Sequence, residues 1–225
     1  AIIIHFNNLD NLDEAENYDK LFNNLRDFFQ NKYSIFIFVG SDFLYNIINY
    51  RPKVRQIFVN IPIEIGKLSI NEMKMLIKKR LTYMRIGNRD YIEPHSEEAL
   101  KLLYTLYDGN ARDILNSLST SVQHLKDRNT PTFIEEIKLK EILYNVANDM
   151  FLKKISPNEQ KVLNEIIRLK KTTNSELANI LQKQRQHISS YLNKLLGIRA
   201  IKVDFIEGTK KYYSLTAEAL WLKFK

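Results

Sequence analysis

The chain has 225 residues and 44% apolar side chains, which is enough for one large domain or two small ones with their own cores. It has no Cys, which excludes disulfides and thiolate metal sites, and its four His are scattered along the chain. Its apolar runs are too short to span a bilayer, and no secretory signal pattern opens the chain. We therefore expect a soluble, cytoplasmic protein with no membrane partner and no metal site.

The formal net charge is +8, and most of it lies in the last third of the chain. Residues 155–225 contain 13 Lys and Arg against 6 Asp and Glu, whereas the first 154 residues contain 21 against 20. A basic surplus confined to one domain-sized region predicts a polyanionic partner, most often nucleic acid. The alternative is a basic surface that is only solvated.

Two short apolar runs, Ile2–Phe6 and Ser34–Val39, are typical of fully buried strands. The stretch between them, residues 13–32, has apolar side chains near helical spacing. A strand, a helix and a second strand of this kind predict a parallel pair in a sheet that is covered on both faces. Two strands alone would leave bare edges, so we expect the chain to hold only the C-terminal part of a larger α/β core.

The stretch IIIHFNNLDNL, residues 2–12, resembles the Walker B strand of AAA+ ATPases, above all those of initiator (origin-recognition) type. The resemblance implies a nucleotide site in which an acidic pair holds Mg²⁺ and orients the attacking water. On this register Asn7 and Asn8 replace the acidic pair, and Asp10 matches a later acidic position. The stretch IFIFVGSD, residues 35–42, resembles the sensor-1 strand, which implies that Ser41 reports on the γ-phosphate.

Residues 51–81 resemble the AAA+ passage from the trans-acting arginine region into the helical lid. The resemblance implies an arginine finger, for which Arg55 is a better candidate than Arg51. The stretch DGNARDILNSL, residues 108–118, resembles the sensor-2 motif and implies that role for Arg112. Taken together, the resemblance covers about residues 1–130.

The sequence departs from this family because it has no G-x-x-x-x-G-K-[ST] loop to bind phosphates. We therefore expect no ATP hydrolysis by this chain, and ATP with Mg²⁺ as cofactors only of an intact longer protein. A neutral Asn8 cannot take a proton from water, so that protein would be a slow ATPase or a nucleotide switch. Each pattern also has a simpler explanation: Asn7-Asn8 and Gly40-Ser41 suit turns, and Arg112 suits a helix surface.

Capping signals divide the rest of the chain into helices. Ser69 with Glu72 predicts the start of a lid helix, and Thr132 with Glu135 predicts another that ends near Asn148. Three further helices are predicted at 157–169, 174–182 and 185–196, opened by Ser156-Pro157 and Thr173 and closed by Gly197. Alternating strands at 201–206 and 211–215, with a turn at Glu207-Gly208, precede a last helix at 217–224 that includes Trp221.

Three helices followed by a two-stranded hairpin resemble the winged helix-turn-helix of transcription regulators, and the domain that follows the lid in initiator-type AAA+ proteins. The second helix of such a motif enters the major groove, where Arg can read guanine and Gln or Asn can read adenine. Ser190 and Lys194 are better placed for phosphate. The predicted DNA-binding residues are Gln184, Arg185, Gln186, His187, Ser189, Ser190, Asn193 and Lys194 of the helix, and Thr209, Lys210 and Lys211 of the wing.

The sequence thus predicts a mostly α fold with short β elements. Residues 1–66 would be the end of an AAA+ core, residues 67–150 a helical lid, and residues 151–225 a winged-helix domain. The expected function is double-stranded DNA binding by a fragment of an initiator-like AAA+ ATPase, which could self-associate through its core. Two alternatives remain: a non-catalytic winged-helix transcription regulator, and a signalling ATPase whose winged helix binds protein.

Overall fold

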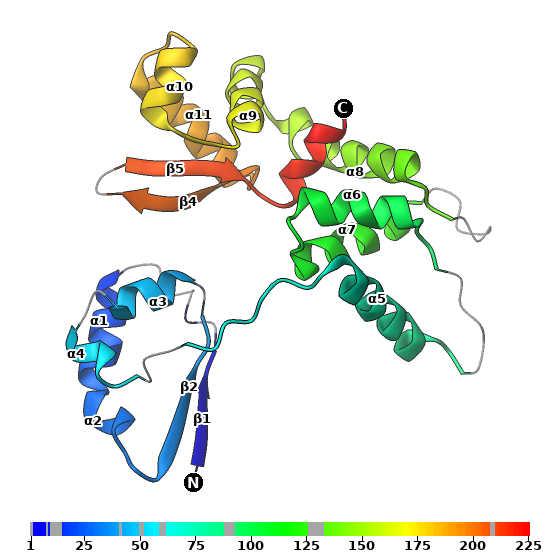
Figure 1. The fold of residues 1–225 in the computed structure, drawn as a ribbon. Helices are drawn as coiled ribbons and strands as arrows, with labels where there is room; N and C mark the ends of the chain where they lie inside the picture. Colours follow the sequence, from blue (N-terminus) through cyan, green and yellow to red (C-terminus); the bar gives the residue numbers. More distant parts are fainter. Residues whose placement is uncertain are drawn as a thin grey trace. The chain divides into compact units, whose positions relative to one another are not determined.

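Figure 1 shows the computed structural model of the chain, which describes residues 2–7, 9, 15–40, 42–49, 52–58, 62–87, 93–125, 133–207 and 210–225. The fold is mostly helical with a few short strands, as the sequence predicts. The chain divides into two units, residues 1–66 and residues 67–225.

The first unit is built on two parallel strands, β1 (Ile2–Phe6) and β2 (Ser34–Phe38), which pair from Ile2 opposite Ser34 to Phe6 opposite Phe38. The predicted strands and their parallel pairing are confirmed. The predicted crossover helix is interrupted at Leu25, which divides it into α1 (Ala15–Asn24) and α2 (Arg26–Phe29). Two more helices follow β2: α3 (Asp42–Asn49) and α4 (Pro52–Arg55).

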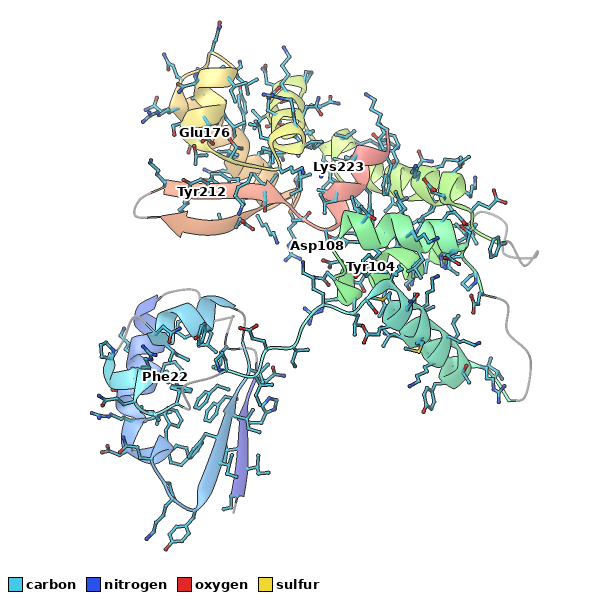
Figure 2. All side chains as sticks on the ribbon, in the orientation of Figure 1. Phe22, Tyr104, Asp108, Glu176, Tyr212 and Lys223 are labelled. Carbon is cyan, nitrogen blue, oxygen red and sulfur yellow. The ribbon has the colours of Figure 1, made fainter. Side chains whose placement is uncertain are left out.

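An aromatic cluster forms the core of this unit on one face of the strand pair. The rings of Phe6 and Phe38 stack with centroids 5.0 Å apart, and Phe29 packs edge-on against both. Phe22, labelled in Figure 2, is fully buried in the same cluster. Successive side chains of a strand point to opposite faces, so the other face presents Ile3, Ile35 and Ile37, which are exposed. The described residues of this unit cover one face of the β1–β2 pair and leave the other face exposed. The prediction that both strands are fully buried is therefore wrong for these residues.

The second unit begins with four helices: α5 (Ile70–Met84), α6 (Glu97–Leu106), α7 (Ala111–Gln123) and α8 (Glu136–Met150). The capping box of Ser69 and Glu72 is present as predicted. The predicted helix start at Thr132 is wrong: Thr132 lies outside the described residues, and α8 starts at Glu136 after an N-cap, Glu135, that makes no side-chain cap bond. Ile134 is extended instead, because it forms an isolated β-bridge with His95.

The C-terminal part of this unit follows the predicted order of elements. Its members are η2 (Leu152–Lys154), α9 (Pro157–Leu169), β3 (Lys171–Thr173), α10 (Asn174–Ile180), α11 (Arg185–Gly197), β4 (Ile201–Glu207), β5 (Lys210–Leu215) and η3 (Glu218–Phe224). The strands form an antiparallel sheet in the order β3-β5-β4, in which β3 was not predicted. Gly197 is the last residue of α11 and not its cap, since Ile198 is the C-cap and Arg199 takes the positive φ of 58°. The last helix is of the 3-10 type.

A buried hydrogen-bond network joins η3 to the helices at the start of this unit. The indole Nε1 of Trp221 donates to Tyr107 Oη and Ser117 Oγ, and the Tyr107 hydroxyl donates to the carbonyl of Ala217. Burial raises the pKa of Tyr107 to about 12, so its hydroxyl stays protonated. The boundary predicted near residue 150 therefore falls inside a unit whose core is continuous across it.

Candidate nucleic-acid interface

The start of α10 is fixed by a capping box that also occupies the nearest acidic side chain. Thr173 Oγ1 accepts from the backbone N–H of Glu176 at 3.3 Å, and the Glu176 carboxylate accepts from the backbone N–H of Thr173 at 2.8 Å. This backbone hydrogen bond, followed by one from Thr172 Oγ1, lowers the pKa of Glu176. Figure 2 labels Glu176 at the start of α10. The negative charge is thus held at a helix N-terminus, where it is favourable.

Residues 181–184 form the turn between α10 and α11. The backbone N–H of Lys183 donates to the carbonyl of Ala178 at 3.0 Å, and Gln182 takes a left-handed conformation with φ of 50°. A left-handed residue after the last turn ends a helix and redirects the chain. Asn174 Nδ2 then donates to the carbonyl of Arg185 at 3.4 Å, which links the start of α10 to the start of α11.

The two faces of α11 differ completely in their surroundings. Ile188, Leu192 and Leu195 are buried in the core of the second unit, at 0–1% exposure. The opposite face is polar and open to solvent. The structure places all eight predicted residues of this helix among the exposed side chains: Gln184, Arg185, Gln186, His187, Ser189, Ser190, Asn193 and Lys194. Helical periodicity therefore presents a continuous polar surface that the buried side chains hold rigidly.

The segment that forms this face contains charges of one sign. Residues 177–203 contain no Asp or Glu, whereas they contain five Lys and Arg. Neither Arg185 nor Lys194 forms an ion pair with a carboxylate of the described residues. Both cations are therefore available to an anionic partner, at a surface where no neighbouring acid in the sequence opposes binding.

The β4–β5 hairpin adds further basic side chains. Lys210 and Lys211 are exposed at the start of β5, where they lie opposite Glu207 and Ile206 in the strand register. Thr209, the third residue predicted for the hairpin tip, lies outside the described residues. At the other end of the sheet, Lys171 forms an ion pair with Asp204 at 2.5 Å.

Lys183 and Lys202 are among the basic residues of this region that were not predicted from the sequence. Lys202 is exposed on β4, and Lys183 lies in the turn before α11 with its ammonium 5.9 Å from the centroid of the Tyr191 ring. That distance is within the range of a cation–π interaction. The acid-free run of residues 177–203 is the pattern that could have identified both residues.

Of the six residues predicted for a nucleotide site, Asn7, Arg55 and Arg112 lie among the described residues. Asn8, Asp10, Ser41 and Arg51 lie outside the described residues. Asn7 is exposed directly after β1, and Arg55 is exposed at the end of α4, beside a shallow depression that Asn49, Pro52 and Gln56 also line.

Arg112 belongs to the other unit, at the start of α7, where its backbone N–H donates to the side chain of Asn110 at 3.1 Å. Gly109, in the turn before this helix, has a positive φ of 76°. Because Asn7 and Arg55 lie in the first unit and Arg112 in the second, the structure does not relate their positions.

The described residues contain neither a membrane-spanning helix nor a metal-binding group of side chains. No helix there is both long and apolar enough to cross a membrane. No group of three or more His, Asp or Glu side chains in those residues is arranged to hold a metal ion.

The chain is similar over part of its length to a known protein. No family model matches the sequence. The chain is 27% identical over 160 residues to a protein of Methanocaldococcus jannaschii that is named as an uncharacterised HTH-type transcriptional regulator. The match covers 69% of this chain and 39% of that protein, so the chain spans well under half of the relative's length. Because the match covers 69% of the chain, it must include most of α5–α8 wherever along the chain it begins. The similarity is therefore not confined to the α9–β5 region.

Proposed function

We propose that residues 67–225 are the DNA-binding part of a transcription regulator, and that residues 156–216 within them are a winged helix-turn-helix. In this proposal α10 and α11 are the two helices of the motif, and β4 with β5 is the wing. The observation that supports it best is the outer face of α11, which is polar, exposed and free of acidic residues. The similarity to a protein named as an HTH-type regulator supports the same function.

The chemistry of the α11 face suits base reading at its start and phosphate binding further along. Arg185 can donate two hydrogen bonds to guanine, and Gln184 or Gln186 can pair with adenine, in the major groove. These residues form the N-terminal end of α11, which is the end that enters the groove in this motif. Ser190 and Lys194, one and two turns later, would contact phosphate and fix the orientation of the helix.

The hairpin would bind the backbone beside the groove. Lys202, Lys210 and Lys211 are exposed on its two strands, and their ammonium groups are point charges that suit phosphate better than a base edge. Binding should therefore be strongly salt-dependent, because each neutralised phosphate releases condensed counterions.

Fluorescence anisotropy with labelled duplex DNA across a salt series tests this proposal. We expect Arg185→Ala/Lys194→Ala to weaken binding and to flatten the dependence of log K on log salt. The charge-matched control is Lys20→Ala/Lys32→Ala in the first unit, where both side chains are exposed. Absence of duplex binding by the unmodified chain at low salt would overturn the proposal. That result would favour an α11 face that binds protein, as in the signalling alternative.

A second candidate function is that of a nucleotide-responsive DNA-binding protein of the AAA+ initiator type. The parallel β1–β2 pair and the Gly109–Arg112 turn are the observations that favour it. A thermal-shift titration with Mg·ATP tests it on this chain. A rise in Tm with ATP that Arg112→Ala abolishes would support this candidate, whereas an unchanged Tm at saturating ATP would remove nucleotide binding from this chain.

A further inference from the structure

A second basic surface lies on α5, outside the segment used in the proposed function. Residues 73–87 contain five Lys and Arg and no Asp or Glu. Four of the five are exposed, and we name them the α5 basic cluster: Lys78, Lys79, Arg80 and Arg85. The fifth, Lys74, forms an ion pair with Glu97 at 2.6 Å. Lys79, Arg80 and Arg85 form no ion pair with a carboxylate of the described residues.

The packing of α5 directs these cations outward. Met73 is fully buried, and Ile70 and Ile77 are half-buried against the core of the second unit. Residues on the opposite side of the helix are therefore turned to solvent. Tyr83 follows Lys79 by four residues and is 88% exposed, so a phenol hydroxyl and an ammonium lie on the same outer face.

Helix stability does not explain three of the four cations of the cluster, whereas Arg85, the C-cap residue of α5, lies where a cation favours a helix C-terminus. The last turn of α5 contains no basic residue, so Lys78, Lys79 and Arg80 lie beyond the range in which cations favour a helix C-terminus. Lys74 and Lys78 are like charges four residues apart, which disfavours the helix. The one acid of α5, Glu72, is occupied by the capping box, where its carboxylate accepts from the backbone N–H of Ser69 at 2.7 Å. The charges of Lys79, Arg80 and Arg85 are thus not neutralised by a carboxylate of the described residues.

The side chains of this face favour a phosphate backbone over a lipid surface. A helix that lies on a membrane needs one continuous apolar stripe facing the lipid. On α5 the continuous apolar side is the one packed inward. The outer Met75 and Tyr83 are separated by Lys79, and the exposed Met84 and Ile86 lie only at or just after the C-terminal end of the helix. Lys, Arg and Tyr side chains are common donors to the phosphates of DNA.

We propose that the α5 basic cluster binds phosphate groups of duplex DNA without regard to base sequence, and so extends the contact made by α11. This inference rests on the proposed function, because it assigns a second contact with the same partner. Figure 1 shows α5 as the first helix of the second unit. α5 lies almost wholly within the span of the match to the relative.

The test is anisotropy with a labelled duplex across a salt series, using Lys79→Gln/Arg80→Gln. Gln has nearly the helix propensity of Lys and Arg, so α5 should remain folded, which far-UV circular dichroism checks. Lys20→Gln/Lys32→Gln removes the same charge from the first unit and is the matched control. We expect the α5 variant to reduce the salt slope by about 1.8, or 0.9 per lost phosphate contact, and to raise Kd about tenfold at low salt. The loss should be equal for duplexes of different sequence.

The outcomes separate this inference from the proposed function. If the unmodified chain binds DNA and Arg185→Ala/Lys194→Ala weakens it, but the α5 variant matches its control, the inference is overturned and the proposed function stands. If the unmodified chain binds no duplex, both are overturned. A loss of binding to vesicles of anionic lipid in the α5 variant, with DNA binding unchanged, would assign the cluster to a membrane surface and overturn the inference.

Discussion

The helices α11 and α5 both present basic side chains to solvent, but their polar chemistry differs. The outer face of α11 combines Arg with Gln, His, Ser and Asn, which offer both donors and acceptors. The α5 basic cluster offers donors alone, since Lys and Arg have no acceptor. Base edges are distinguished by patterns of donors and acceptors, whereas phosphates accept from any donor. Sequence specificity for DNA should therefore depend on α11, whereas α5 should contribute affinity without sequence specificity.

Burial separates the two helices further. In α11, Ile188 and Leu195 are fully buried and Leu192 is 1% exposed, so three side chains anchor one helix of 13 residues. In α5, which has 15 residues, Met73 is the one buried side chain among the described residues. A base-reading helix must be held rigidly to discriminate, whereas a phosphate contact tolerates looser placement.

The largest expected effect tests this difference in anchoring. Leu192→Ala should lower the free energy of unfolding by about 2–5 kcal/mol, because it leaves a cavity in the core. Met75→Ala on α5 should change it by less than about 0.5 kcal/mol, since Met75 is 56% exposed. Urea unfolding followed by circular dichroism measures both. Equal losses in the two variants would mean that Leu192 contributes no more to the core than an exposed side chain does.

The next effect concerns the support beneath α5 and depends on pH. His95 lies in a hollow of about 250 Å³ that Lys74 and Ile77 of α5 also line, and its Nε2 lies 2.8 Å from Ser121 Oγ. Burial lowers the pKa of His95 from 6.5 to about 4, and a backbone hydrogen bond with Leu118 opposes that shift. Between these two values the unfolded chain binds a proton that the folded chain does not. Stability should therefore be unaffected above pH 6.5 and should fall by about 3 kcal/mol as the pH drops from 6.5 to 4.

Urea titrations at several pH values check this, with His95→Gln as the comparison. Carboxylates titrate in part of the same range, so the measured quantity is the difference between the two profiles. The unmodified chain should lose more stability than His95→Gln between pH 6.5 and pH 5. Parallel profiles would mean that His95 is not shielded from water beneath α5.

Base discrimination gives the third effect. Arg185→Ala should cost about 1–3 kcal/mol on a preferred duplex and much less on duplexes that lack the base it reads. Lys79→Gln should weaken all duplexes alike. Sequences that the chain binds are first selected from a random library. Anisotropy on the enriched duplex and on a scrambled duplex then gives the ratio of the two Kd values. Discrimination between the two duplexes that is lost in Lys79→Gln and kept in Arg185→Ala would reverse the roles assigned to the two helices.

Local sequence rules predicted much of the region around α11. Capping boxes depend on residues three apart, and the structure has those of Ser156 and Thr173 where they were predicted. The start of α8 could not be predicted in this way. There the Thr132–Glu135 pattern was present, but the pairing of Ile134 with His95, far away in the sequence, kept the backbone extended. Long-range pairing overrides a local cap because two backbone hydrogen bonds, from Ile134 N to Pro94 O and from Ser96 N to Ile134 O, outweigh it.

The candidate site was predictable to a similar extent and for the same reason. The eight residues of the α11 face follow from helical periodicity once the helix is placed. Lys183 was missed because a turn has no regular period. Lys202 was missed because strand alternation gives the face of a residue but not the acids that lie near it. The α5 basic cluster was not recognised from the net charge, since the first 154 residues are close to neutral when they are counted together.

The smallest expected effect compares the caps of the two regions. Thr173 is buried at the start of α10, and its Oγ1 also lies 3.2 Å from Ser175 Oγ, whereas Ser69 is exposed at the start of α5. Thr173→Ala should lower the free energy of unfolding by about 1–2 kcal/mol, because it removes a cap and leaves the backbone N–H of Glu176 without that partner. Ser69→Ala should cost about 0.5–1 kcal/mol, since water can replace the hydroxyl at an exposed helix end. Urea midpoints at constant m-value give both numbers. A larger loss for Ser69→Ala would show that α5 depends on its cap more than on its packing. α5 would then be one of the less stable parts of the unit. A helix of that kind suits a sequence-independent phosphate contact better than base reading.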